Sequence, residues 1–255
     1  MLLRSSFLST AHRCLAEAYY KYHLGLTPIG SGRPNKDLFF GSAVHEAVVK
    51  AIKEGEEVAI QYLDSLLWPP TKAKSKRVAV ALVRRYMRCF SPTYVSDERS
   101  FIFPVGKHLW RGRFDIIGYT DGTIVVENKT TKPAFLIQKP NNQFISYYHA
   151  ARNIFPDFTQ FVVYNLDPGM LEIHQYPIRF FDEEIDYWLK TTAKFADYAE
   201  ECFETGHVPR SDTNCIRFNS RICSYYDICT SHGKVQENVI NNCFNVSEEV
   251  KKMNY

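Results

Sequence analysis

The sequence predicts an α/β fold, in which a central mixed β-sheet is flanked by helices. Three observations lead to this fold class. Apolar residues at helical spacing fill the first third of the chain, and β-type and helical segments alternate after it. The chain contains no run of about 18 apolar residues, the length that a membrane-spanning helix needs. With 255 residues and 45% apolar content, the chain can bury one substantial core. We expect one domain, 1–255, comprising a mainly helical region (1–95), a sheet-bearing core (96–205) and a cysteine-bearing tail (206–255) tied to the N-terminal helix.

Glycine and proline mark the ends of the helices in the first region. We expect helices over 5–24, 39–54, 56–67 and 75–90. Gly25, Gly55 and the Pro69-Pro70 pair follow three of them, as is typical of helix ends. The segment 27–37 is rich in Gly, Pro, Ser and Asn and predicts a loop.

Strands and helices alternate in the core. We expect strands near 97–105, 109–119, 123–130, 159–166 and 171–178, and helices from Pro140 through Ile154 and from Asp182 to Thr205. Turn sequences separate paired strands, with Asp121-Gly122 after the second strand and Asp167-Pro168-Gly169 between the last two. This order of elements suits a mixed sheet with helices on its faces.

The register of the hairpin at Asp121-Gly122 decides which side chains share a sheet face. Even positions are apolar, whereas odd positions carry Arg111, Arg113, Asp115, Glu127 and Lys129. Because side chains alternate along a strand, the charged groups share a face only if odd positions lie opposite odd positions. A three-residue loop, 121–123, would pair position 115 with 129, whereas a two-residue turn would split the set. We therefore expect the three-residue loop or an equivalent bulge.

Charge and cysteine content narrow the class of protein. The net charge of +3 permits nucleic-acid binding without arguing for it. One local basic stretch is either a solvated helix face or a surface that follows phosphates, and it comprises Lys72, Lys74, Lys76, Arg77, Arg84, Arg85 and Arg88. Seven cysteines and no export signal favour metal ligation or buried thiols over disulfides. We expect a cytoplasmic protein, in the host cytoplasm if it is viral, without membrane association.

Asp115, Glu127 and Lys129 lie within apolar segments, where an ionisable group needs a partner. Two carboxylates and an ammonium group on one sheet face can hold a hard divalent cation beside a scissile phosphate. Mg²⁺ or Mn²⁺ suits oxygen ligands, and the backbone carbonyl of Asn128 could supply a further oxygen. The ion would lower the pKa of a bound water, and Lys129 would orient that water or stabilise the phosphate. The alternative is a structural ion pair between Lys129 and a carboxylate.

The Asp115…Glu127-Asn128-Lys129 pattern resembles the core motif of the PD-(D/E)XK nuclease superfamily. Two further motifs resemble its RecB-like branch, which includes the AddB nuclease domain and the CRISPR-associated adaptation nuclease. They are Gly41-Ser42-Ala43-Val44-His45 upstream and Gln143-Phe144-Ile145-Ser146-Tyr147 downstream. One cysteine near the N-terminus and three near the C-terminus complete the likeness over 9–229. The resemblance implies a restriction-endonuclease-like core.

The resemblance also implies roles for other residues. His45 sits in an apolar helix, where a lone histidine is more often a core residue, but the resemblance makes it a metal ligand and favours Mn²⁺. Gln143 and Tyr147 share a helix face and would position DNA and the active site, the alternative being a capping glutamine and a half-buried tyrosine. Glu98 and Arg113 are weaker candidates, for a further carboxylate and a phosphate contact.

Cys14, Cys215, Cys223 and Cys229 form a second candidate site. By resemblance they hold a [4Fe-4S] cluster that ties the first helix to the tail, with zinc as the main alternative and ordinary thiols as another. Their spacing departs from that of the branch, in which the first two C-terminal cysteines are usually two residues apart. Leu15 also follows Cys14, where proline is common. We expect a structural cluster whose loss impairs folding.

Together with the resemblance, these residues predict a metal-dependent DNA nuclease. The resemblance implies an exonuclease acting at DNA ends, with single strands favoured, in recombination, repair or phage DNA processing. A structure-specific endonuclease on the same core and a non-catalytic, metal-stapled DNA-binding protein are the alternatives. The sequence has no Gly-x-x-x-x-Gly-Lys-Ser/Thr phosphate loop, so unwinding would need a helicase or recombination partner.

Overall fold

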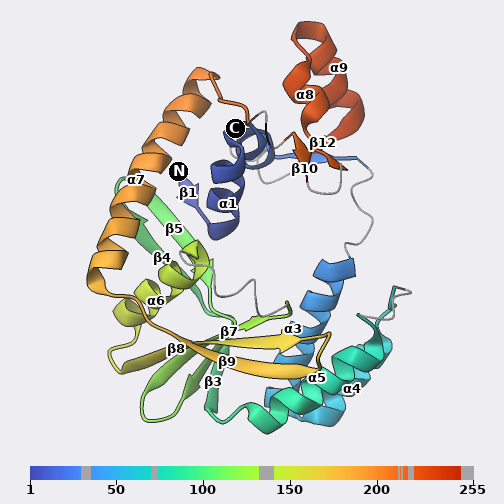
Figure 1. The fold of residues 1–255 in the computed structure, drawn as a ribbon, viewed down its shortest axis with the longest axis vertical. Coiled ribbons are helices and arrows are strands. Elements are labelled where there is room, and N and C mark those ends of the chain that lie inside the picture. The colour runs from blue at the N-terminus through green and yellow to red at the C-terminus, as the bar shows by residue number, and fades with distance from the viewer. Residues whose placement is uncertain are drawn as a thin grey trace. The chain divides into compact units, whose positions relative to one another are not determined.

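The computed structural model describes residues 1–29, 36–69, 74–131, 141–211, 213, 215–217 and 221–247. The chain divides into two compact units, each drawing on segments far apart in the sequence (Figure 1). The terminal unit comprises Met1–Arg33, Pro104–Trp110 and Leu189–Tyr255, and the sheet unit comprises Pro34–Phe103 and Arg111–Trp188. This division into units does not test whether 1–255 is a single domain, so that expectation stays a prediction.

A mixed five-stranded sheet forms the centre of the sheet unit. Its strands in spatial order are β3 (Thr93–Asp97), β6 (Ile116–Tyr119), β7 (Thr123–Lys129), β8 (Phe158–Asp167) and β9 (Glu172–Ile178). β7 and β8 run parallel, with Lys129 opposite Asn165, and the other neighbours are antiparallel. The predicted α/β class with a central mixed sheet is confirmed.

Helices cover both faces of this sheet (Figure 1). They are α3 (Lys36–Glu54), α4 (Glu56–Ser65), α5 (Lys76–Cys89) and α6 (Asn142–Ile154). The first three pack on one face, where their apolar side chains share a core with even-numbered residues such as Ile116 and Val126. α6 joins β7 to β8 on the opposite face, where Phe144 and Tyr147 pack against Phe161. A sheet with a parallel pair is typically buried on both faces in this way.

Two of the predicted strands each break in two. The expected strand 97–105 is divided between β3 and β4 (Ser100–Val105), and 109–119 between β5 (His108–Arg113) and β6. The breaks meet, because the Glu98 amide donates to the Asp115 carbonyl at 3.1 Å. Glu98 has a left-handed backbone (φ 31°), so the two segments turn a corner together. Asp115 consequently lies in a bend between strands, not within one.

The hairpin has the expected three-residue loop but a different register. Tyr119 pairs with Thr123, so the loop comprises 120–122, one residue earlier than predicted. Odd positions still lie opposite odd positions within the hairpin, but Arg113 and Asp115 precede β6, so this pairing does not place them on the sheet face of Glu127 and Lys129. Gly122 favours this register, because a Cβ at that position would lie 2.5 Å from the carbonyl oxygen of Asp157.

The terminal unit joins the two ends of the chain. Its elements are β1 (Leu2–Leu3), α1 (Ser5–Arg13), α2 (Leu15–Ala18), a π-helical turn (Tyr19–His23), β2 (Leu26–Pro28), most of α7 (Asp182–Thr205), β10 (Ile216–Arg217), β11 (Arg221–Ile222), α8 (Tyr226–Thr230), α9 (Gly233–Cys243) and β12 (Phe244–Val246). β1 pairs with β5, and β12 with β2. Tyr225 stacks between Tyr20 and Phe244, so the tail packs onto the N-terminal segment.

Predictions for the two chain ends need correction. The expected helix 5–24 is interrupted at Cys14, whose extended backbone (φ −160°) separates α1 from α2. The tail (206–255) also contains two helices that were not predicted, α8 and α9. No described helix is both long enough and apolar enough to cross a membrane. Several predicted features lie wholly or partly outside the described residues, namely the loop 27–37, Pro70, Lys72 and Pro140.

Candidate functional site

The carboxyl end of β7 brings four of the predicted site residues together. Glu127, Asn128 and Lys129 are the last three residues of that strand, and Asp115 lies in the bend before β6. The backbone N–H of Asn128 donates to Oδ2 of Asp115 at 2.9 Å. This hydrogen bond fixes the Asp115 carboxylate at the end of β7, where groups from both sheet faces can approach it.

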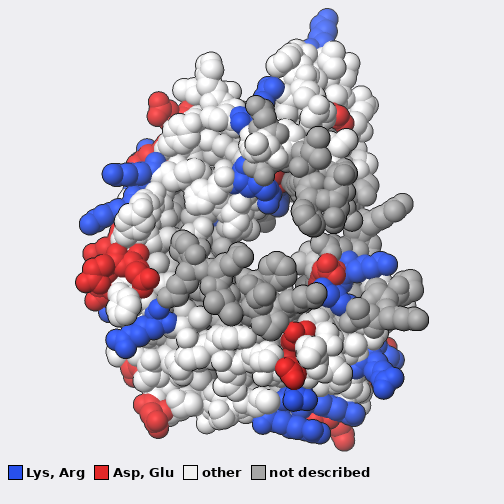
Figure 2. Space-filling view, in the orientation of Figure 1, with Lys and Arg blue, Asp and Glu red and all other residues white. Residues whose placement is uncertain are grey.

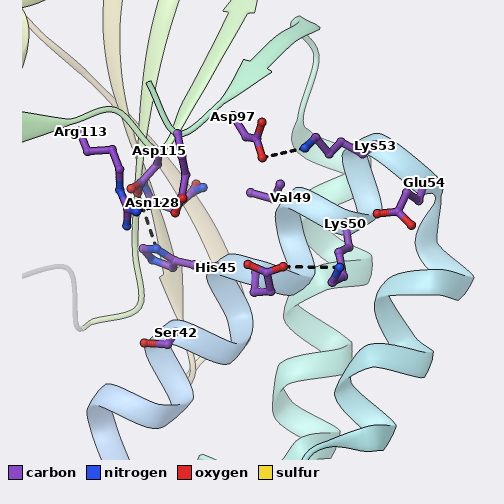
Figure 3. A pocket seen from close by; sticks show the side chains of 12 residues that line it. Ser42, His45, Val49, Lys50, Lys53, Glu54, Asp97, Arg113, Asp115 and Asn128 are labelled. Atoms are coloured by element: carbon purple, nitrogen blue, oxygen red, sulfur yellow. Dashed lines mark hydrogen bonds and ion pairs between the residues drawn. The ribbon is translucent and has the colours of Figure 1, made fainter. Parts of the chain in front are cut away.

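His45 reaches the same carboxylate from α3. Its Nδ1 lies 3.6 Å from Oδ2 of Asp115 (Figure 3). One helical turn earlier, a Cβ on Gly41 would lie 3.0 Å from Oγ1 of Thr130, so glycine permits the helix to approach the end of β7. Burial lowers the pKa of His45, an effect that Asp115 opposes and Lys129 reinforces. The imidazole is therefore neutral near pH 7 and available as a metal ligand.

Glu127 is 2% exposed, and its Oε2 has no hydrogen-bond partner among the described residues. Burial and the nearby negative charge of Asp115 raise the pKa of this carboxyl, against the opposing effect of Lys129, to about 8. A buried carboxyl with an unpartnered oxygen, beside the half-buried carboxyl of Asp115, is unfavourable for the protein alone.

Lys129, Gln143 and Tyr147 form a hydrogen-bonded chain around Glu127. Lys129 Nζ donates to Glu127 Oε1, and at 2.9 Å to Oε1 of Gln143. Gln143 Nε2 in turn donates to Glu127 Oε1 at 2.8 Å and to the Tyr147 hydroxyl at 3.1 Å. Burial raises the pKa of Tyr147 above its usual range, so its hydroxyl stays protonated. The helix cap is Asn141, whose side chain accepts from the Gln143 amide, so Gln143 is not itself the cap.

A cavity of about 280 Å³ opens beside His45, Asp115 and Asn128 (Figure 3). Oδ1 of Asn128 is buried and has no hydrogen-bond partner among the described residues. This side-chain oxygen, which the sequence reasoning did not single out, offers a donor where a backbone carbonyl was expected. Glu127 and Lys129 do not line the cavity, and approach Asp115 from the other face of the sheet.

Ion pairs line the rest of this cavity. Arg113 contacts Glu98 at 3.0 Å, and Lys53 contacts Asp97 at 2.7 Å (Figure 3). The two weaker candidates from the sequence thus lie at the cavity, paired with each other. Lys53 and Asp97 were not predicted, because they are 44 residues apart and only the helix–strand packing brings them together.

The chemistry of these donors suits a divalent cation, although the ligand atoms of His45, Asp115 and Glu127, all within the described part of the chain, do not all lie within 4.8 Å of one another. An imidazole, two carboxylates and an amide oxygen are ligands that Mg²⁺ and Mn²⁺ accept, with the imidazole favouring Mn²⁺. The unpartnered Glu127 Oε2 and Asn128 Oδ1 are buried oxygens that such a cation would satisfy.

The four predicted cysteine ligands lie together in the terminal unit. Cys14, Cys215, Cys223 and Cys229 all line one small cavity. The β10–β11 hairpin places two of them, since the Cys223 amide donates to the Cys215 carbonyl at 2.8 Å. Burial and the neighbouring Cys14 thiol together raise the pKa of Cys229 to about 11. A bound cation would offset the cost of ionising such thiols.

The terminal unit contains a further group of possible metal ligands that was not predicted, formed by His108, Asp197 and Glu200. Its ligand atoms lie within 4.8 Å of one another. Lys107 already contacts Asp197 at 3.4 Å and Glu200 at 2.8 Å, so an ammonium group neutralises these carboxylates. The arrangement is that of a local ion-pair network.

Comparisons with known proteins agree with this geometry. The sequence model of the PD-(D/E)XK nuclease superfamily matches residues 5–230. A solved structure from Eubacterium rectale, described as a candidate exonuclease, has a TM-score of 0.53 at 12% identity, covering 91% of this chain and 94% of that one. The structure of SSO0001 has a TM-score of 0.33 at 17% identity, covering 82% of this chain and 96% of that one. This similarity is too low to support an inference. No curated protein gives a significant match.

Proposed function

The chain belongs to the PD-(D/E)XK nuclease superfamily, and from this membership we propose that it is a metal-dependent deoxyribonuclease of the RecB-like branch, acting at DNA ends. One observation carries the proposal. The buried carboxyl of Glu127, its Oε2 unpartnered among the described residues, lies beside Asp115. A folded protein keeps such an arrangement at a cost, unless a cation completes it.

His45, Asp115, Glu127 and a side-chain oxygen of Asn128 are the residues that would hold Mg²⁺ or Mn²⁺. When bound, the ion would supply a water of lowered pKa and positive charge beside the phosphate. The protein's own contribution is to hold the ligands in place. The Asn128 amide orients Asp115, and the neutral His45 ring presents a nitrogen lone pair.

Lys129 is the residue that would contact the reacting phosphate or the attacking water. Burial lowers the pKa of its ammonium group, but hydrogen bonding and the nearby carboxyl groups of Glu127 and Asp115 raise it by more. Gln143 accepts one of its hydrogen bonds at 2.9 Å and is held in turn by Tyr147 at 3.1 Å. Gln143 and Tyr147 are therefore positioning residues, which keep a positive charge fixed where negative charge develops on phosphate.

Two motif contacts support the RecB-like assignment, and with it DNA as substrate. Gly41 and His45 of the upstream motif place α3 against the end of β7. Gln143 and Tyr147 of the downstream motif belong to the Lys129 network. Each motif residue thus has a contact that its type explains.

We further propose a [4Fe-4S] cluster on Cys14, Cys215, Cys223 and Cys229, which line one cavity. The resemblance to the RecB-like branch favours a cluster, with a single zinc ion as the main alternative. A brown protein containing iron and sulfide supports this assignment, whereas a colourless protein containing zinc contradicts it.

Degradation of labelled DNA tests the proposed function. Protein purified anaerobically should degrade end-labelled linear single strands with Mn²⁺ and not with EDTA. Lys129→Ala should abolish cleavage, while Lys194→Ala, an exposed lysine on α7, serves as the matched control. Cleavage of a circular single strand would replace the exonuclease by an endonuclease on the same core. Tight DNA binding without any cleavage would leave a non-catalytic binding protein.

A further inference from the structure

We propose that the outward face of α5 binds the sugar-phosphate backbone of the DNA substrate, away from the bond that is cut. This inference rests on the proposed function and adds a binding surface to it. α5 carries five basic residues and no acidic one, the basic residues being Lys76, Arg77, Arg84, Arg85 and Arg88. Its buried side is apolar, so the charged residues form one continuous outer stripe.

Most of this stripe is not neutralised. Lys76 contacts Asp64 at 3.0 Å, and Arg84 contacts Glu56 at 3.0 Å. Arg77, Arg85 and Arg88 are exposed and form no ion pair within the described part of the chain. In Figure 2, blue side chains gather along the lower right of the molecule, over α5 as Figure 1 labels it. The face therefore keeps a local excess of positive charge on a chain of only +3.

The stripe borders an open groove of about 800 Å³. Val80, Ala81 and Leu171 line it together with the basic residues. Leu171 belongs to the turn after β8, and β8 runs parallel to β7 with Asn165 opposite Lys129. Leu171 therefore lies at the same end of the sheet as the candidate site, within the same unit.

The chemistry of the groove fits a phosphate backbone better than a protein surface. Its cations are mostly arginines, whose planar donors match phosphate oxygens. The residues lining it include no aromatic side chain of the kind that anchors protein interfaces. From Arg77 to Arg88 a helix rises roughly 17 Å, at about 1.5 Å per residue, enough for a few consecutive phosphates. The contacts are to phosphates alone, so we expect no sequence preference from them.

Salt dependence of binding tests this surface directly. The variant combines Arg77→Gln, Arg85→Gln and Arg88→Gln in a Lys129→Ala background, so that DNA is not cut. Its affinity for a fluorescent 30-nucleotide strand, and for the matching duplex, is measured in EDTA across a series of KCl concentrations. Each phosphate contact contributes about 0.7 to the slope of log K against log salt for single strands and about 0.9 for duplex. We expect the slope to fall by about 2 for the strand and by nearly 3 for the duplex.

A second triple variant controls for net charge. It combines Arg179→Gln, Lys190→Gln and Lys194→Gln, which remove three exposed charges elsewhere, and it should keep the slope. Equal slopes for the α5 variant and the parent overturn the inference, even if the α5 variant has lost binding to phosphatidylserine vesicles instead. Cleavage is scored separately with Lys129 intact. If the protein cuts DNA but the slopes are unchanged, only the proposed binding surface is refuted. If the slope falls but no DNA is cut, only the proposed nuclease activity is refuted.

Discussion

Replacing Glu127 by glutamine should stabilise the metal-free protein while abolishing DNA cleavage. The side chain is 2% exposed, and burial is the first cause that raises its pKa from 4.5 to about 8. Between these pH values the folded chain keeps a proton that the unfolded chain releases. Stability therefore falls as pH rises through this window, by about 1.4 kcal/mol per pH unit for a group fully in this state.

The expected change in stability follows from the width of this pH range, from 4.5 to about 8. At pH 7 the wild type should have lost about 3 kcal/mol relative to its stability near pH 4.5, and above pH 8 the loss should level off. Glutamine keeps the shape of the protonated acid and does not titrate. Glu127→Gln should therefore be up to about 3 kcal/mol more stable than the wild type at pH 7, and about equally stable near pH 4.5.

Urea unfolding in EDTA at a series of pH values measures this difference. Glu54→Gln, at the cavity on α3, controls for the removal of one negative charge. Mn²⁺ should then stabilise the wild type by mass action and the Glu127→Gln variant much less. Parallel curves of stability against pH for wild type and Glu127→Gln would refute the reasoning. So would a Glu127→Gln variant that is less stable than the wild type at every pH.

Three further predictions concern other parts of the chain. Gly122→Ala places a Cβ 2.5 Å from the carbonyl oxygen of Asp157 and should therefore cost about 1–3 kcal/mol of stability. Thermal unfolding measures this loss, and an unchanged midpoint temperature of unfolding would contradict the tight loop. Glu200, whose pKa the Lys107 hydrogen bond lowers to about 2, contributes stability above pH 4.5 that is lost as pH falls toward 2. Glu200→Gln should therefore cost up to about 1 kcal/mol at pH 7 and nothing at pH 2, and an equal cost at both would exclude the ion pair as its cause. Cys223→Ser should lower both the visible absorbance and the iron content of the anaerobic protein, and an unchanged spectrum would remove Cys223 from the ligand set.

The sheet and the Lys129 strand could be predicted from sequence because their signals are local. Apolar alternation and the Asp121-Gly122 turn identify β6 and β7, and the apolar helices that cover one face precede them directly. The hairpin register could not be predicted, because it depends on the close approach of Gly122 to Asp157, 35 residues later, which only a residue without a Cβ permits. The corner at Glu98 and Asp115 was likewise missed, since it is made by a backbone hydrogen bond between two separate segments.

The candidate site, likewise, could be predicted only where its signals are local in the sequence. Parity placed Glu127 and Lys129 on one sheet face, and Gln143 and Tyr147 follow from their spacing of four on a helix. Their mutual hydrogen bonds could not be predicted, because they depend on how α6 crosses the sheet. Lys53 and Asp97 could not be predicted for a similar reason, since one is on α3 and the other on β3.

The way the terminal unit closes has a consequence for synthesis on the ribosome. The Tyr225 hydroxyl donates to the Leu26 carbonyl across 199 residues, and Tyr20 stacks on the same ring. At roughly 5–20 residues per second, the first helices emerge about 10–40 seconds before their partner exists. During translation their apolar side chains stay uncovered, as targets for chaperones, until Tyr225 and Phe244 have been synthesised.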